Sequence, residues 1–264
     1  MTVSAPKMST AKRNLRDFPW WIAILVGAAI LFLIHLAMNP EARELYASAF
    51  AFVWPGVIVT LQVTFFAYAL ALVIGLLVGL LRLSHNPVIF NVATVYVEVM
   101  RGLPMLVIVL YAGFVVRPAI RDMTGGALDP SMMVGAIVGL AVGYGAFLSE
   151  VFRSGIQSIS KGQMEAAKSL GMNYFQAMRL VILPQAIRII LPPLGNDLIA
   201  LLKDSALVAV LALPDTLQLG RLWISRTFRA LEGYNTVAIY YLAMTVILSV
   251  TVGFIERRTR QGRQ

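Results

Sequence analysis

The sequence predicts an all-α protein that is integral to a membrane and has about six transmembrane helices. Of its 264 residues, 59% are hydrophobic and only 13% are charged, whereas a soluble domain has about 45–50% apolar and about 25% charged residues. One soluble core cannot hide such an excess, because a folded domain still exposes much of its surface. The apolar residues also gather into runs long enough to cross a bilayer, which takes about 20 residues.

Six apolar runs have this length, and each is expected to form one span. The first follows a basic tail, as the apolar part of a signal peptide does, but it is long for such a segment and no small-residue cleavage site follows it. We therefore expect it to be retained as a first span. The runs are Trp20–Met38, Gly56–Leu81, Thr94–Val116, Met132–Phe152, Ile189–Leu213 and Asn235–Ile255.

The positions of the basic residues predict which side of the membrane each loop faces. Most of the 22 lysines and arginines fall in the N-terminal tail, in the loops after the second and fourth runs, and in the C-terminal tail. Cytoplasmic loops carry such an excess, so both termini are expected in the cytoplasm. The net charge of +9 is then an orientation signal rather than a sign of nucleic-acid binding.

The loop between the fourth and fifth runs, residues 153–188, is predicted to hold two short helices outside the membrane. Gly171 stands where the first helix has to stop, because glycine supplies the left-handed conformation of many helix ends. Pro184 is expected to close the second helix. Two pairs have the form of a capping box at a helix start, namely Ser160 with Gln163 and Asn173 with Gln176.

One face of these two helices is suited to contact with another protein. Ala166 and Ala167 are small enough for another surface to approach closely, and Glu165 can pair with a cation. An apolar ridge is expected from Met164, Leu170, Phe175 and Met178. Outside the bilayer such a ridge is buried only where a partner covers it. A plain solvated loop is the alternative that these residues leave open.

The same segment resembles the coupling motif in the membrane subunits of ABC importers. The motif consists of Glu-Ala-Ala, three residues, glycine, nine residues and Ile-x-Leu-Pro, and Val181 replaces its isoleucine here. The matching residues are Glu165, Ala166, Ala167, Gly171, Leu183 and Pro184. In that family the motif forms the coupling helix, which docks in a groove of the ATPase subunit. We call residues 153–188 the coupling segment.

The resemblance narrows to the permeases of polar amino-acid uptake systems, of the histidine, glutamine and arginine type, and covers about Gly56 to Arg258. It is carried by SEVFRSGIQSISKGQMEAAKSLGM, LPQAIRIILPPLGNDLIALLKDSAL, VTLQVTFFAYALALVIGLLVGLLRLS and YVEVMRGLPML. Two departures remove polar groups near the expected path: Leu103 replaces a common threonine and Ile108 a frequent glutamine.

The resemblance implies a permease subunit with no catalytic residues, which passes a polar amino acid across a bacterial inner (plasma) membrane. It implies an ABC type-1 transmembrane domain over residues 56–255. A cytoplasmic tail (1–19) and an additional helix with an external loop (20–55) precede this domain, and a cytoplasmic tail (256–264) follows it.

The resemblance also implies the partners. A dimer of ABC ATPase subunits binds ATP and Mg, a second permease chain (identical or related) pairs with this one, and an extracytoplasmic solute-binding protein delivers the amino acid. No cofactor, metal or nucleic acid is expected on this chain, and lipid surrounds it. The sequence has no GxxxxGK[ST] phosphate loop, so hydrolysis is expected in another polypeptide.

Two other classes of function fit the sequence less well. A secondary transporter or channel driven by an ion gradient has its sites at broken helices within repeated halves, and the sequence shows no such repeat. A membrane-embedded enzyme needs a nucleophile with its base, or a metal cluster, and neither pattern is found. With no cysteine in the chain, thiolate zinc sites and iron–sulfur clusters are excluded.

The fifth run carries the candidate substrate path. A charge in mid-membrane costs about 2.5–3.5 kcal/mol on insertion scales, so charges kept there deserve a functional hypothesis. Residues seven apart lie on one helical stripe. With Pro192 and Pro193 as the expected helix start, Lys203 and Asp204 fall near mid-membrane. The candidates are Asn196, Asp197, Lys203, Asp204 and Ser205. The alternative is an internal ion pair that only holds helices together.

Glu150, in the fourth run, is a further candidate for the path. Its spacing to Arg153, like that of Glu98 to Arg101, also suits an interfacial ion pair within one helix. Three glycines four residues apart in the same run favour close helix packing: Gly135, Gly139 and Gly143.

Overall fold

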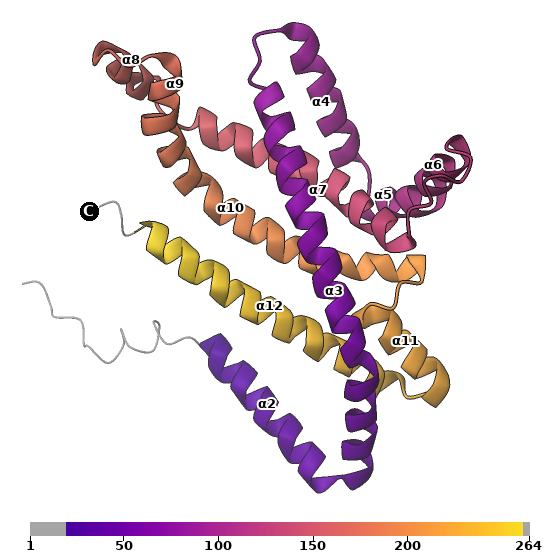
Figure 1. Cartoon of the computed structure of the whole chain (residues 1–264). Coiled ribbons are helices and arrows are strands. Elements are labelled where there is room, and N and C mark those ends of the chain that lie inside the picture. The colour runs from indigo at the N-terminus through magenta and orange to yellow at the C-terminus, as the bar shows by residue number, and fades with distance from the viewer. Residues whose placement is uncertain (1–19, 261–264) are drawn as a thin grey trace, which may run out of the picture. The chain divides into compact units, whose positions relative to one another are not determined.

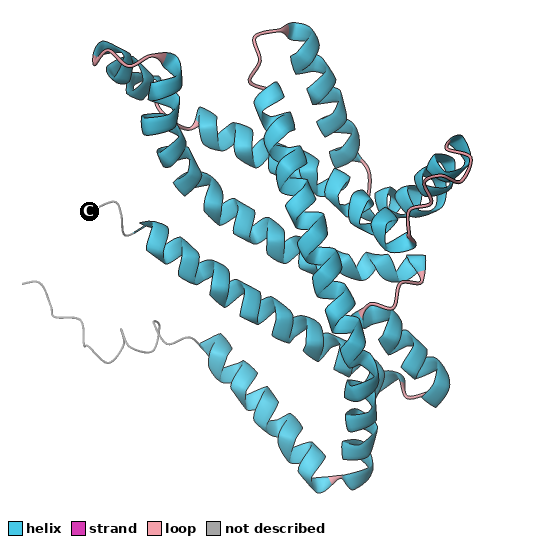
Figure 2. Ribbon diagram, viewed as in Figure 1, coloured by secondary structure: helices cyan, strands magenta, loops and turns pink. Residues whose placement is uncertain are grey.

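The computed structural model describes residues 20–260, and every regular element in that range is a helix (Figure 1, Figure 2). The all-α prediction is therefore confirmed for the described residues. The predicted cytoplasmic tail 1–19 and the last part of the C-terminal tail, 261–264, lie outside them. The chain divides into two compact units, one up to Ser48 and one from Ala49 onward.

The first unit contains α2 (Trp20–Met38), whose bounds are those predicted for the first run. Its apolar side chains are largely exposed, as they are in a helix that faces lipid. Asn39 ends the helix, because its side-chain amide donates to the His35 carbonyl at 3.0 Å. The following Pro40 then begins α3 (Pro40–Leu81), at a position where proline's missing N–H costs nothing.

The second predicted run, Gly56–Leu81, is only the later part of α3. The prediction for the third run is wrong, because Thr94–Val116 is not one helix. It divides into α4 (Pro87–Gly102), α5 (Met105–Tyr111) and a π turn, η1 (Ala112–Val116). α6 (Arg117–Met123) follows directly.

The break in this run lies at Leu103 and Pro104. Leu103 is extended, with ψ of 140°, because a residue before proline is excluded from the helical region. The helical path bends by 106° at this break. A continuous span was the wrong prediction, although Pro104 was there to indicate the break.

The helix after this bend, α7 (Met132–Gln157), lies at the centre of the second unit. It packs against α4, α5 and α10 (Leu183–Asp204). The glycine spacing has the predicted packing role: a methyl group on Gly139 would come within 3.2 Å of the Val109 Cα atom. Leu140 and Leu148 of α7 are fully buried in the main core.

The coupling segment begins in the last turns of α7 and continues with α8 (Lys161–Ser169) and α9 (Tyr174–Ala177). The prediction that Pro184 closes the second helix is wrong. A π turn, η2 (Met178–Ile182), follows α9 and leads directly into α10. The π turn widens the helix just before the proline, so the helical path continues from Tyr174 through Pro184 (Figure 1).

Pro192 and Pro193 lie inside α10 rather than at its start, which corrects a second boundary. Lys203 and Asp204 occupy the last turn of α10, and their position near mid-membrane stays a prediction. The chain then tightens into a 3-10 helix, η3 (Ser205–Leu211). α11 (Thr216–Thr227) and α12 (Ala230–Arg260) complete the described chain.

Four helical stretches in the described residues are long and apolar enough to cross a membrane. The bent α4–α6 region would be a fifth span. In α2 only Val26–Met38 enters this comparison, so the first predicted span stays a prediction. Length and composition thus support the last five of the six predicted spans. The four continuous stretches are Pro40–Leu81, Met132–Gln157, Tyr174–Leu211 and Ala230–Arg258.

Candidate functional site

The end of α8 has the geometry that the sequence predicted. Gly171 is in the left-handed region, with φ of +82°. Its N–H donates to the Lys168 carbonyl, and the Met172 N–H donates to the Ala167 carbonyl at 3.2 Å. These two bonds form a Schellman motif, which lets the chain reverse between α8 and α9.

The predicted helix starts are confirmed to different degrees. Asn173 and Gln176 form a full capping box, in which each side chain accepts from the other residue's backbone N–H. Ser160 caps α8, but its hydroxyl accepts from the Gly162 N–H at 3.3 Å. The Gln163 side chain does not complete a box, and contacts the Gln185 amide instead.

The two short helices present apolar side chains to their surroundings. Leu170 is 79% exposed and Phe175 is 71% exposed, and Tyr174 lies beside them in sequence. Glu165 and Ala166 are also exposed, whereas Ala167 is buried against the segment itself. Of the predicted ridge, Met164 and Met178 are half-buried. The exposed surface is therefore formed by Leu170, Tyr174 and Phe175 around the small Ala166.

The last two residues of the predicted motif, Leu183 and Pro184, lie at the start of α10. Both are exposed at this junction. They follow the π turn, so they mark the point where the short helices α8 and α9 give way to the long helix α10.

A second site is formed where α10 meets α7 and the α4–α5 break. A cavity of about 220 Å³ there contains the side chains of Asp197 and Asp204. We call it the two-aspartate pocket. Its lining consists of Leu103, Met105, Tyr144, Phe147, Asp197, Ala200 and Asp204. The seven-residue spacing of the two aspartates correctly predicted that they share a face of the helix.

Tyr144 holds one of these carboxylates. Its hydroxyl donates to the Asp204 Oδ2 atom at 2.8 Å, which fixes the rotamer of the aspartate. Tyr144 and Phe147 are adjacent aromatic rings on α7, with centroids 6.0 Å apart. The pocket thus combines carboxylates, a phenol and apolar walls, the mixture that small-molecule sites use.

The remaining candidates from the fifth run do not line this pocket. Asn196 and Lys203 are exposed on another face of α10. Ser205 is fully buried, and its hydroxyl donates to the Leu202 carbonyl at 2.7 Å. Within the described residues no ion pair joins Lys203 to an aspartate, so the alternative of an internal ionic lock has no support there.

Glu150 also lies outside the two-aspartate pocket. It forms the predicted pair with Arg153, at 2.9 Å, and two further ion pairs with Arg82 and Arg101. The expected pair of Glu98 with Arg101 is not among the ion pairs of the described chain; Arg101 turns to Glu150 instead.

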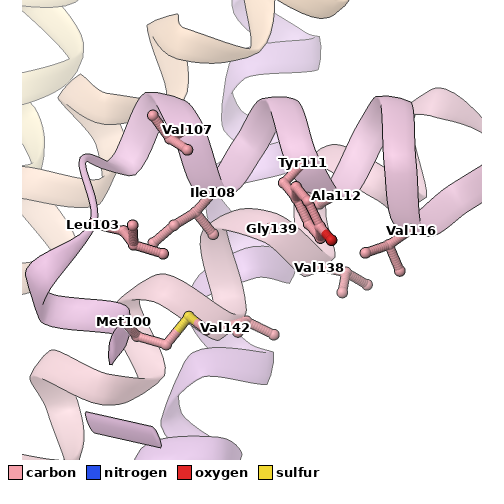
Figure 3. Close-up of a pocket in the computed structure, with 10 residues that line it drawn as sticks. All are labelled: Met100, Leu103, Val107, Ile108, Tyr111, Ala112, Val116, Val138, Gly139 and Val142. Carbon is pink, nitrogen blue, oxygen red and sulfur yellow. The ribbon is translucent and has the colours of Figure 1, made fainter. Parts of the chain in front are cut away.

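A larger, almost wholly apolar cavity of about 510 Å³ also adjoins the α4–α5 break (Figure 3). Leu103, Ile108 and Val142 line it, together with Tyr111. Ile108 stands where the permeases of polar amino-acid uptake systems frequently have a glutamine. The replacement fits a wall that is apolar throughout, because a polar group here would lose its hydration.

Sequence reasoning missed five pocket residues: Leu103 as a wall, Met105, Tyr144, Phe147 and Ala200. Tyr144 and Phe147 carried a usable signal, since they are three residues apart on α7 and so share one face. Nothing in the sequence placed that face opposite Asp197 and Asp204.

Comparison with known proteins shows which sequences and folds this chain is similar to. The profile of the family described as "binding-protein-dependent transport system inner membrane component" matches residues 71–261. The arginine transport system permease protein ArgU of Corynebacterium glutamicum is 33% identical over 99% of this chain and 86% of its own length. The glutamine transport system permease protein GlnP of Escherichia coli K12 is 36% identical over 79% of this chain and 96% of its own.

The fold has a solved counterpart. The crystal structure of an amino acid ABC transporter with histidines superposes with a TM-score of 0.70 and 37% sequence identity. That similarity covers 79% of this chain and 94% of the other. These similarities favour an ABC permease over an ion-driven transporter or channel.

Proposed function

The chain belongs to the family of binding-protein-dependent transport system inner membrane components, and on that premise we propose that it is the permease subunit of an ATP-driven importer for amino acids with a cationic side chain. Its role is to form the translocation path. The hydrolysis of ATP belongs to a separate subunit.

The observation that carries this proposal is the pair of carboxylates in one cavity. Asp197 and Asp204 both line the two-aspartate pocket, and no basic side chain lines it. A carboxylate removed from water is stabilised by a cation within hydrogen-bond reach. The cavity of about 220 Å³ is below the range of about 300–1,000 Å³ that holds drug-sized ligands, which suits one small solute. The name of the 33% identical ArgU relative points the same way.

The exposed surface of the coupling segment supports an ATPase partner. Leu170 and Phe175 would lose most of their exposed apolar area in a groove of that subunit, and apolar burial drives such association. The proposed complex has an ATPase dimer that binds ATP and Mg, a second permease chain, and an extracytoplasmic solute-binding protein. Both termini and the coupling segment face the cytoplasm of a bacterial cell, because most basic residues lie on that side.

The test is uptake of radiolabelled amino acids by the source cells with and without this gene. L-arginine, L-lysine, L-histidine, L-glutamine and L-glutamate form the panel. We expect deletion to remove uptake of the cationic members, and uptake to persist when the ion gradient is collapsed but ATP is maintained. Loss of only the neutral or acidic members would contradict the substrate class. Uptake that follows the gradient would contradict the ATP-driven mechanism.

A further inference from the structure

Glu150 is the centre of a charge cluster that joins three helices. Its carboxylate receives a hydrogen bond from Arg82, which directly follows α3, and lies 3.6 Å from the Arg101 guanidinium in the last turn of α4. The third partner, Arg153 at 2.9 Å, belongs to α7 itself. Two of these contacts therefore cross between helices and one does not.

The cross-helix contact with Arg82 is strongly buried. The Arg82 side chain is only 6% exposed, and its Nε atom has no hydrogen-bond partner among the described residues. A buried guanidinium is tolerated where a counter-charge reaches it. Glu150 supplies that charge, so the end of α3 is held to α7 by this carboxylate.

The contact with Arg101 leads to the two-aspartate pocket. The Arg101 guanidinium lies over the Phe147 ring, 5.7 Å from its centroid, within the range of a cation–π contact. Phe147 lines the two-aspartate pocket, and so does Leu103, two residues after Arg101. Glu150 and the Phe147 ring thus hold Arg101 from two sides, and both belong to α7.

The same helix leads directly to α8, the first short helix of the coupling segment. α7 ends at Gln157, and α8 begins at Lys161 with Ser160 as its cap. Glu150 lies about two helical turns before the end of α7. A displacement of α8 therefore reaches Glu150 through a short, regular helix.

We propose that Glu150 is a positioning residue that makes the wall of the two-aspartate pocket follow the coupling segment. It holds the end of α4 on α7 through Arg101, so that Leu103 and Phe147 move together when α7 moves. Glu150 does not touch the substrate in this role. The inference rests on the proposed function, because it needs a substrate in the two-aspartate pocket and an ATPase on the coupling segment.

The experiment compares two arginines that share one carboxylate. The complete transporter, purified through a tag on this chain with its ATPase and solute-binding protein, is reconstituted in proteoliposomes. ATP hydrolysis is measured with and without L-arginine. Arg101→Gln is the test variant, because the Arg101 side chain is 44% exposed and its loss leaves no buried charge unpaired. Arg153→Gln is the matched control, because its pair with Glu150 stays within α7.

We expect Arg101→Gln to keep the basal rate and to lower the stimulation by L-arginine about five-fold, which corresponds to about 1 kcal/mol of lost contact. Arg101→Lys should recover part of the stimulation, because the positive charge remains. Arg153→Gln should be stimulated like the wild type. In a double-mutant cycle, Arg101→Gln should have little further effect in a Phe147→Leu background, since the two residues act through one contact.

Two outcomes would overturn the inference while leaving the proposed function in place. One is full stimulation of Arg101→Gln, and the other is an equal loss in Arg153→Gln, which would indicate a general structural role for the cluster. A wild-type transporter that no amino acid stimulates would overturn the proposed function, and the inference with it.

Discussion

The coupling segment and the two-aspartate pocket are built in opposite ways. The turn and the caps of α8 and α9 come from residues within a few positions of one another, such as Asn173 with Gln176 and Gly171 with Lys168. The two-aspartate pocket takes its lining from α5, α7, α10 and the residue that ends α4. The first region folds by local rules, whereas the second exists only when α7 and α10 pack together.

This difference implies that the two regions fail differently when mutated. A local motif depends on backbone conformation, so one wrong residue at a turn should abolish it. A pocket formed by several helices keeps its backbone when one side chain changes, so its losses should be confined to ligand selectivity. The predictions below test this contrast, from the largest effect to the smallest.

Gly171→Val should have the largest overall effect, because it should lower the uptake of every amino acid, whereas a pocket variant should lower that of cationic ones alone. A residue with a Cβ in the left-handed region costs about 1–2 kcal/mol, and a β-branched residue is a stronger outlier there. A Cβ at Gly171 would meet no atom within 4 Å, so the loss would come from the backbone alone. We expect ATP-driven uptake to fall at least about ten-fold with a normal amount of protein in the membrane.

The matched control for this variant is Gly162→Val in the first turn of α8. There a Cβ would meet only the Ser160 hydroxyl at 3.5 Å, an ordinary contact. Equal damage from both variants would show that valine itself, rather than the left-handed conformation, is harmful in the coupling segment.

Asp204→Asn should change selectivity more than the amount of protein. Asparagine keeps the shape and still accepts from Tyr144, but the negative charge is lost. Hydrogen bonds to charged groups contribute about 1.5–3 kcal/mol, so L-arginine uptake should fall about ten- to a hundred-fold. Uptake of a neutral amino acid should change little. The comparison with Asn196→Ala, an exposed site on the same helix outside the pocket, separates the charge effect from damage to α10.

Tyr144→Phe should have a smaller effect on the same pocket. It removes the 2.8 Å hydrogen bond to Asp204 and leaves the ring in place. The charge on Asp204 remains and only its orientation is released, so we expect the loss in affinity to be about 1 kcal/mol, below the full contribution of a hydrogen bond to a charged group. Half-saturation should then need about five-fold more L-arginine. An unchanged value would show that Asp204 keeps its position without this tyrosine.

Asn173→Ala should have the smallest effect, although it removes a motif that the sequence predicts well. Loss of a helix cap costs about 0.5 kcal/mol at the low end, which corresponds to about a two-fold fall in uptake. Asn173→Ser keeps a capping oxygen and serves as the control. A complete loss of uptake in Asn173→Ala would mean that this side chain contacts the ATPase directly.

Features that depend on residues close together in the chain could be predicted from the sequence, and features that depend on helix packing could not. The helical class, the first helix, the turn at Gly171 and the box at Asn173 depend on local patterns, and they were predicted. The errors at Pro184 and Pro192 arose because a π turn and the packing of neighbouring helices let a long helix accommodate prolines. Asp197 and Asp204 could be paired by helical periodicity. Tyr144 and Phe147 could not be placed opposite them, because no local pattern records which helices pack together.

The unbroken helical path from Tyr174 to Leu211 has a mechanical consequence. It joins the end at Tyr174 and the end that carries Asp204 into one lever. If this lever turns as a rigid rod about Pro192, its arms are about 27 Å to Tyr174 and about 18 Å to Asp204. A swing imposed at Tyr174, next to the surface where we propose that the ATPase docks, would then reach the carboxylate with about two thirds of its amplitude, and with proportionally greater force.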